Sequence, residues 1–146
     1  MRYALVPVCL AAALAASGCR SALPPTLEVR SARASTDGGV SVVTLEIRAS
    51  NPNRDAIPLD TIRYELSING TKAFVGERMP RLSLPGFGER TLLLPAACTL
   101  DVTAGTPFHA SGELVYVPPG SWRQTLRETG LGRPSVTFEG TGTVRP

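Results

Sequence analysis

The stretch Ser41–Glu77, SVVTLEIRASNPNRDAIPLDTIRYELSINGTKAFVGE, contains the strand and turn patterns from which the fold can be predicted. It contains two runs in which apolar residues alternate with polar ones: Val43, Leu45 and Ile47 in the first, and Ile62, Tyr64, Leu66 and Ile68 in the second. Successive side chains of a strand point to opposite faces of a sheet, so this alternation predicts half-buried strands. Each of the two strands is therefore expected to turn one face toward a core.

Turn residues follow both runs. The first run ends at Asn51-Pro52-Asn53, where the proline cannot donate to a strand ladder and the asparagine side chains are suited to closing a turn. The second run ends at Asn69-Gly70, which predicts a type I′ hairpin turn into a strand over Lys72–Gly76. We interpret both motifs as determinants of the fold rather than as ligand-binding sites.

The pattern of strands and turns continues on either side of this stretch. Leu27–Arg33 predicts a strand that leads into a turn at Asp37-Gly38-Gly39. Four more strands are expected at Arg90–Leu94, at Leu100–Val102, at Phe108–Tyr116, and from Val136 onward, where Gly140 and Gly142 continue the apolar face. Glycines on that face indicate close packing or a bulge.

One short helix is expected late in the chain. Ser121 and Gln124 form a capping box, and Gly130 suits the left-handed residue that ends a helix. Seven or eight short strands with one helix predict an all-β fold, an antiparallel β-sandwich. We assign this domain to residues 26–146.

The composition is that of one small folded domain. Of the 146 residues, 18% are charged and 42% are hydrophobic, and there are 14 glycines and 13 prolines. This charged fraction is low for a disordered chain, and this glycine and proline content is high for a helical one. The length excludes a large multidomain enzyme. The net charge of +3, with acidic residues interspersed, gives no reason to expect nucleic acid as a partner.

The first 18 residues have the pattern of an export signal. One positive charge in Met1–Tyr3 precedes an uncharged run, Ala4–Ala16, which is too short to span a bilayer but fits a signal peptide. The run leads into Ala16-Ser17-Gly18-Cys19, which resembles the bacterial lipobox, although Ala16 stands where leucine is commonest. The alternative is an ordinary signal peptide cut near Ala16.

A lipobox implies cleavage between Gly18 and Cys19 and attachment of acyl chains, such as palmitate, to Cys19. Two or three chains anchor a protein firmly, because each buried CH₂ contributes about 0.8 kcal/mol. Residues 19–25 would then be the lipidated cysteine and a short tether. Arg20, rather than aspartate, follows Cys19, which favours the outer membrane. We therefore expect a bacterial lipoprotein that faces the periplasm.

The sequence holds no recognisable catalytic or metal-binding motif. A Gly-x-Ser-x-Gly elbow, a phosphate-binding loop and a histidine pair are all missing. We interpret Cys98 as a small buried apolar residue rather than as a nucleophile, and we expect His109 to point away from the apolar face of its strand. We predict a protein that is not an enzyme and has no cofactor or metal.

An ordered set of motifs resembles the late embryogenesis abundant type 2 domain, also called the WHy (water stress and hypersensitive response) domain. The motifs are Asn51-Pro52-Asn53, Tyr64-Glu65-Leu66, Asn69-Gly70 and Gly76-Glu77. The later SGELVYVPPG, residues 111–120, is also similar. The resemblance covers about residues 26–144. It implies a seven-stranded, fibronectin-III-like sandwich with one helix, and a link to desiccation, osmotic or cold stress.

Three functions fit this interpretation. The first is a stress-protective role in which the folded domain acts through its surface. The second is binding of a lipid or a small apolar ligand, for which the candidate contacts are Leu82, Leu84, Phe87 and Leu93. The third is an adaptor role, in which an exposed sheet edge docks a protein partner of the envelope.

Overall fold

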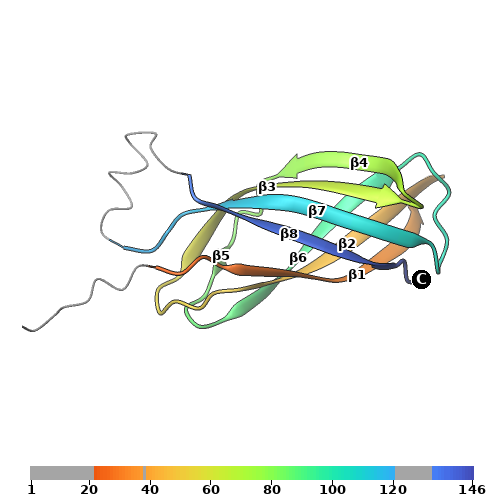
Figure 1. Ribbon diagram of the computed structural model, residues 1–146. Coiled ribbons are helices and arrows are strands. Elements are labelled where there is room, and N and C mark those ends of the chain that lie inside the picture. Colours follow the sequence, from red (N-terminus) through yellow and green to blue (C-terminus); the bar gives the residue numbers. More distant parts are fainter. Residues whose placement is uncertain (1–21, 38, 121–132) are drawn as a thin grey trace, which may run out of the picture.

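The computed structural model describes residues 22–37, 39–120 and 133–146, and in these residues the chain forms two antiparallel sheets that pack face to face (Figure 1). The three-stranded sheet has the order β1 (Thr26–Asp37), β2 (Val40–Ser50), β6 (Glu89–Cys98). The larger sheet has the order β4 (Thr71–Arg78), β3 (Ile57–Ile68), β7 (Pro107–Tyr116), β8 (Ser135–Thr143), and the two-residue β5 (Ser83–Leu84) pairs with the start of β3.

The predicted all-β sandwich is confirmed. Three strands face four, which is the arrangement of a fibronectin-III-like sandwich, and β5 is a short addition to the expected set. The helix expected over residues 121–130 lies outside the described residues.

The alternating runs place one face of each strand in the core, as predicted. Val43, Leu45 and Ile47 of β2 are fully buried, and Ile62 and Leu66 of β3 are fully buried opposite them. The hairpin after β3 is the predicted one, because Asn69 and Gly70 have φ angles of 51° and 76°. Both angles lie in the left-handed region that a type I′ turn requires.

The strand predicted over Leu100–Val102 is wrong, because β6 continues through Pro95 to Cys98 and the chain then bends. A proline is tolerated there because, among the described strands, β6 pairs only with β2, so that the missing N–H faces the edge that has no partner strand in this part of the chain. The Pro95 carbonyl on that edge accepts a hydrogen bond of 2.5 Å from the hydroxyl of Tyr64.

The glycines of the apolar face permit close packing rather than a bulge. A Cβ at Gly140 would lie 2.5 Å from the Cβ of Val29, and one at Gly112 would lie 2.4 Å from the carbonyl oxygen of Arg63. The register between β7 and β8 runs without a shift from Pro107 to Val115. These positions are therefore glycine because backbone and side chains of other strands occupy the space of a side chain.

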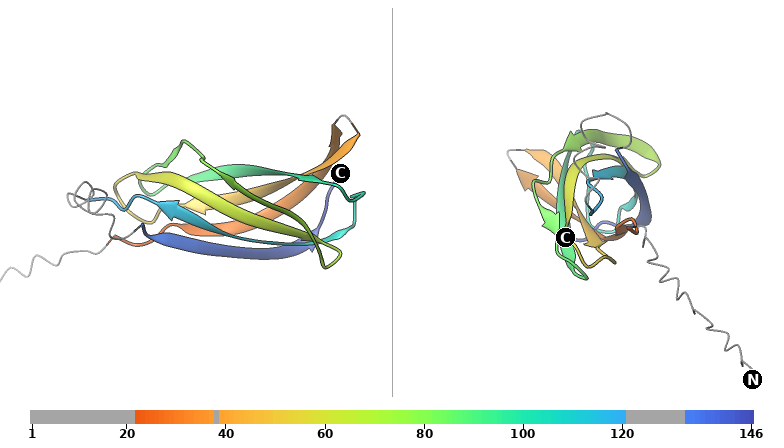
Figure 2. Two further views of the ribbon diagram at one scale, coloured as in Figure 1. Left: turned by 90° about the horizontal axis from the view of Figure 1, so that it is seen from above. Right: turned by 90° about the vertical axis from the view of Figure 1, so that its left-hand side faces the viewer.

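The two sides of the sandwich differ. On one side, the chain after β8 closes against β1, where the amide of Arg145 donates to Ala32 (2.8 Å) and the amide of Ala34 donates to Arg145 (3.0 Å). On the other side, no ladder joins β4 to β6 within the described part of the chain. The view along the long axis shows the sheets curling around the core (Figure 2). The unpaired edges of β4 and β6 make this the open side.

The molecule is elongated, and its two ends carry different connections (Figures 1 and 2). We call one end the N-terminal pole, defined by residues 22–25, 51–56 and 85–88. The opposite end, the C-terminal pole, holds the turn at Asn69-Gly70, the β6–β7 connection and the C-terminus. Chain segments that are distant in sequence therefore meet at each pole.

Candidate functional site

Asn51 is the central residue of the N-terminal pole. It is 3% exposed, and its amide nitrogen donates to the carbonyls of Asp55 (2.8 Å), Pro85 (3.0 Å) and Leu84 (3.3 Å). Its amide oxygen accepts from the backbone N–H of Asn53 at 2.9 Å. One buried side chain thus joins the β2–β3 connection to the β5–β6 connection. The geometry supports the interpretation of this motif as a determinant of the fold.

Asn53 binds the segment that precedes β1. Its amide oxygen accepts from the backbone N–H of Leu23 (2.9 Å), and its amide nitrogen donates to the carbonyl of Leu23 (2.8 Å). The Asn53 side chain therefore binds both the N–H and the C=O of Leu23, in the same way as the backbone of a neighbouring strand would. Sequence reasoning missed this contact, because a separation of 30 residues carries no local signal.

Phe87 stands at the tip of the β5–β6 connection. Its backbone N–H donates to the carbonyl of Asn53 (2.8 Å), and the N–H of Gly88 donates to the carbonyl of Pro85 (3.1 Å). The side chain of Phe87 is 74% exposed, and its φ is 49°. Residues other than glycine rarely adopt this φ, so the surrounding bonds hold an aromatic ring outward on a fixed turn.

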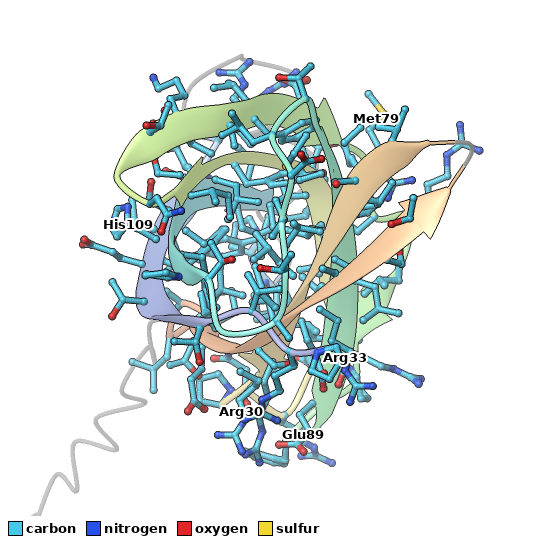
Figure 3. The ribbon with its side chains drawn as sticks, turned by 90° about the vertical axis from the view of Figure 1, so that its right-hand side faces the viewer. Arg30, Arg33, Met79, Glu89 and His109 are labelled. Atoms are coloured by element: carbon cyan, nitrogen blue, oxygen red, sulfur yellow. The ribbon has the colours of Figure 1, made fainter. Side chains whose placement is uncertain are left out.

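A hollow lies on the open side of the sandwich. It has a volume of about 250 Å³ and is lined by Arg78, Met79, Pro80 and Leu82 on one side and by residues 91–94 of β6 on the other. Leu93 is 62% exposed, and Met79, which lies at the outer surface in Figure 3, is 64% exposed. We call this hollow the β4–β6 groove.

The candidate ligand contacts fall into three places. Leu82 and Leu93 come together in the β4–β6 groove. Leu84 is fully buried and belongs to the core, so it is not accessible to a ligand. Phe87 lies at the N-terminal pole, in a separate hollow. The sequence indicated these residues by their apolar character, but strand pairing decides which of them are neighbours.

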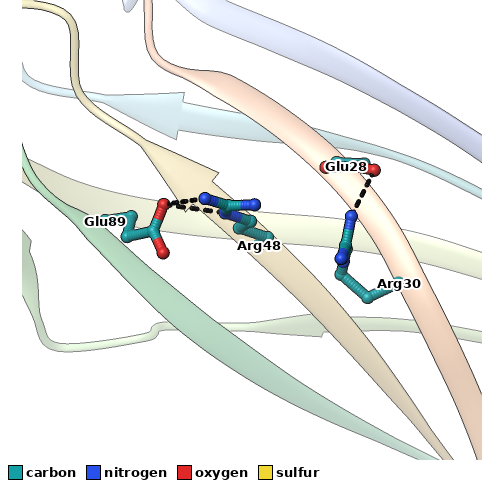
Figure 4. A network of polar contacts seen from close by, with 4 residues as sticks. All are labelled: Glu28, Arg30, Arg48 and Glu89. Carbon is teal, nitrogen blue, oxygen red and sulfur yellow. Dashed lines mark hydrogen bonds and ion pairs between the residues drawn. The ribbon is translucent and has the colours of Figure 1, made fainter.

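Charged side chains form ion pairs on the outer faces of the sheets. On the three-stranded sheet, Arg48 donates to Glu89 with its Nε (2.7 Å) and with a terminal nitrogen, and Arg30 pairs with Glu28 (Figure 4). The hydrogen bond to Glu89 raises the pKa of the Arg48 guanidinium. Solvent-exposed pairs of this kind contribute little to stability. These ion pairs place both positive and negative charges on the outer face of the three-stranded sheet.

His109 and Cys98 have the environments that were predicted. His109 points out of the sheet, as Figure 3 shows, and its Nε2 lies 2.8 Å from a carboxylate oxygen of Glu139. Cys98 is 2% exposed, and its thiol donates to the carbonyl of Ala96 at 3.5 Å. Burial raises the pKa of the Cys98 thiol, which keeps it protonated and makes it a poor nucleophile.

Comparison with known proteins identifies the family. The family model of the late embryogenesis abundant (LEA) type 2 proteins matches residues 46–144, which is more than half of the chain. The chain belongs to this family. No curated protein sequence matches it significantly.

One solved structure shares the fold. The chain is similar to the solution structure of At2g46140.1, which was assigned to the LEA proteins, with a TM-score of 0.50 and 17% identity over 84% of this chain and 72% of that one. It also aligns with a crystal structure of a protein from Archaeoglobus fulgidus (TM-score 0.46, 10% identity, 86% and 99% coverage) and with the solution structure of AT1g01470 from Arabidopsis thaliana (0.45, 11%, 86% and 81%).

The described part of this LEA domain offers neither a metal cluster nor a membrane-spanning helix. Among residues 22–37, 39–120 and 133–146, no three side chains of His, Cys, Asp or Glu gather as a group that could hold a metal ion. Nor does any helix in these ranges have the length and apolar character needed to cross a bilayer. The N-terminal pole and the β4–β6 groove each combine a hollow with exposed apolar side chains, and both are candidate sites.

Proposed function

We propose that this LEA family protein is a lipid-anchored, non-enzymatic protein of the bacterial envelope that protects its surroundings during water loss. The observation that carries the protective role is the family match over residues 46–144. The lipobox-like run that ends at Cys19 supports the anchor, and Arg20 supports a place on the periplasmic side of the outer membrane. The WHy resemblance supports a role in desiccation, osmotic or cold stress.

A folded sandwich protects through its surface, because its strands are committed to a core. On the larger sheet Lys72 pairs with Glu65 (2.9 Å) and Arg63 pairs with Glu77 (2.5 Å), so charges of both signs alternate there. A mixed, exposed charge pattern remains hydrated and resists self-association. A rigid, hydrated body of this kind would keep partly dehydrated neighbours apart.

A drying assay tests the protective role. A labile enzyme is dried and rehydrated with the purified full chain, or with the same mass of serum albumin. We expect more enzyme activity to survive with the LEA protein than with albumin. Equal survival in the two samples would contradict a protective function that is particular to this protein.

Membrane fractionation tests the anchor separately. Cys19→Ser is expected to abolish incorporation of labelled palmitate and to release the protein from the membrane fraction. Cys98→Ser is the matched control, because the Cys98 thiol is buried and should carry no palmitate. A loss of palmitate from Cys98→Ser would show that Cys98, and not Cys19, is the attachment site. Continued membrane retention of Cys19→Ser would count against lipidation.

The β4–β6 groove favours ligand binding as the second candidate function. Its volume of about 250 Å³ falls below the range of about 300–1,000 Å³ typical of small-molecule pockets. This size suits a part of one acyl chain rather than a whole two-chain lipid. The exposed Leu93 and Met79 would then be covered by the bound chain.

Native mass spectrometry with a long-chain fatty acid tests the groove. Leu93→Glu is expected to abolish binding, because it places a charge on the apolar wall. Val75→Glu is the matched control, because Val75 is 64% exposed on β4 and does not line the groove. Equal binding by the two variants would rule out the groove as the site.

The adaptor role predicts a different result. A protein that co-purifies with the chain would favour this role, with strand addition at the free edge of β4 or β6.

A further inference from the structure

We propose that the N-terminal pole is a membrane-contacting surface, on which Leu23 and Phe87 enter the interfacial layer of a phospholipid bilayer and hold the long axis of the domain away from the membrane plane. This inference rests on the proposed lipid anchor and goes beyond it, because an anchor alone leaves the orientation of the domain free. The pole unites three features: a bound tether, two exposed apolar side chains, and charges that suit phospholipid headgroups.

The first feature is the tether. Leu23 is four residues after Cys19 in the sequence, and a chain extends by at most about 3.6 Å per residue, so the two residues lie within about 14 Å of each other. Asn53 holds both backbone groups of Leu23 against the pole. Acyl chains on Cys19 would therefore bring the bilayer to this end of the molecule and to no other.

The second feature is the pair of exposed apolar side chains beside the bound tether. Leu23 is 58% exposed and Phe87 is 74% exposed. Asn53 connects them, because its side chain binds Leu23 and its carbonyl accepts from the N–H of Phe87. Leucine and phenylalanine are common on the apolar face of amphipathic helices that insert into the membrane interface.

The turn that carries Phe87 is rigid. A Cβ at Gly86 would lie 1.8 Å from the carbonyl oxygen of Arg54, and one at Gly88 would lie 2.6 Å from Cγ of Pro85. The turn therefore packs closely on both sides of Phe87, and Phe87 itself has a φ of 49°. A ring held outward on a fixed turn loses little conformational freedom when it enters a bilayer.

The third feature is charge. Arg54 and Asp55 are both exposed and line the hollow of about 580 Å³ that also includes Leu23 and Phe87. A guanidinium binds phosphate oxygens well, and a carboxylate binds an ammonium group. A zwitterionic headgroup such as that of phosphatidylethanolamine presents both groups, so this pair favours a phospholipid surface over a uniformly charged partner.

Depth-dependent quenching tests the orientation. The lipidated protein is reconstituted in vesicles of phosphatidylethanolamine and phosphatidylglycerol, in which part of the phospholipid carries bromine near the headgroup end of its acyl chains. A bimane label is placed on Phe87→Cys or, as the matched control, on Leu100→Cys at the C-terminal pole. Unsubstituted protein, which retains the buried Cys98, measures background labelling.

We expect bromolipid to quench the label at position 87 several times more strongly than the label at position 100, and aqueous iodide to show the reverse order. Flotation with the vesicles and the mass of the acylated chain are measured on the same samples. Floating, acylated protein with equal quenching at the two positions would overturn the orientation and leave the anchor intact. A chain without acyl groups that fails to float would overturn the anchor and, with it, this inference.

Asn53→Ala tests the tether contact. This variant keeps Cys19 but loses the two bonds to Leu23, so we expect the difference in quenching between positions 87 and 100 to narrow while flotation is retained. An unchanged difference would show that Asn53 does not set the orientation. A thermal melt establishes that the variant is folded.

Discussion

At the scale of single residues, Asn51 performs two tasks. Its buried amide satisfies carbonyls of the β2–β3 and β5–β6 connections, and its oxygen closes the turn through Asn53. A buried polar group is tolerated when its hydrogen bonds are formed. Its removal destabilises the protein, because its former partners are then left without hydrogen bonds. The family motif is therefore explained by hydrogen-bond satisfaction at a place where two connections meet.

We predict that Asn51→Ala lowers the free energy of unfolding by about 3 kcal/mol, because it leaves buried carbonyls without donors. Asn53→Ala is the control and is expected to cost about 1 kcal/mol, because its side-chain bonds to Leu23 lie at the exposed surface. It also loses the bond from its Nδ2 to Asn51 Oδ1, but that oxygen keeps the bond from the Asn53 backbone N–H. Urea unfolding at a constant m-value measures both. A loss for Asn51→Ala no larger than that for Asn53→Ala would refute this account of the motif.

At the scale of elements, close contacts at glycines determine how near two strands can pack. Gly140 of β8 faces Val29 of β1, across the side on which the two sheets close. Val29 is β-branched and has few rotamers available, so it cannot move aside easily. The glycine thus sets the spacing between the two sheets at this side.

We predict that Gly140→Ala destabilises the domain by about 1–3 kcal/mol through overpacking. Gly142→Ala is the matched control on the same strand, because its Cβ would meet only the ring edge of Phe108, at 3.0 Å, and Gly142 is exposed. The control is expected to change stability by about 0.5 kcal/mol or less. Thermal unfolding of the two variants compares them directly, and equal melting temperatures would contradict the close-packing argument.

At the scale of the whole molecule, the two sheets share one core, and this core contains a thiol and two phenols, which are weak acids. Burial raises the pKa of the thiol of Cys98 and of the phenols of Tyr64 and Tyr116. Each group is neutral in the folded state and ionises more readily once the chain unfolds. At alkaline pH the folded state therefore binds more protons than the unfolded state, and stability falls as pH rises.

We predict that the free energy of unfolding is unaffected by these groups below about pH 8 and declines above about pH 8.5, where unfolded thiols begin to ionise, and more steeply near pH 10, where unfolded phenols do. Cys98→Ala should remove the earlier part of the decline, and Tyr64→Phe should reduce the later part. Urea unfolding between pH 7 and pH 10.5 measures the slope. A slope unchanged by both substitutions would show that other groups control it.

Most of the strands of this protein, two of its turns and its family can be predicted from the sequence alone. Alternation in β2 and β3 and the turn at Asn69-Gly70 are local properties, because side-chain direction and left-handed backbone angles depend on a few neighbouring residues. The prediction failed at Leu100–Val102, because β6 ends where Cys98 pairs with Ser41 near the start of its partner strand β2. Local composition carries no information about where a partner strand begins.

Which distant residues come into contact depends on the tertiary structure. The contact between Asn53 and Leu23 spans 30 residues, the bond from Tyr64 to Pro95 joins the two sheets, and the β4–β6 groove brings Leu82 to Leu93. Such contacts follow from the register and order of the strands, which are set by the combined packing of both sheets in one core. For this reason the sequence predicted the sandwich, whereas the two candidate surfaces became visible only in the folded chain.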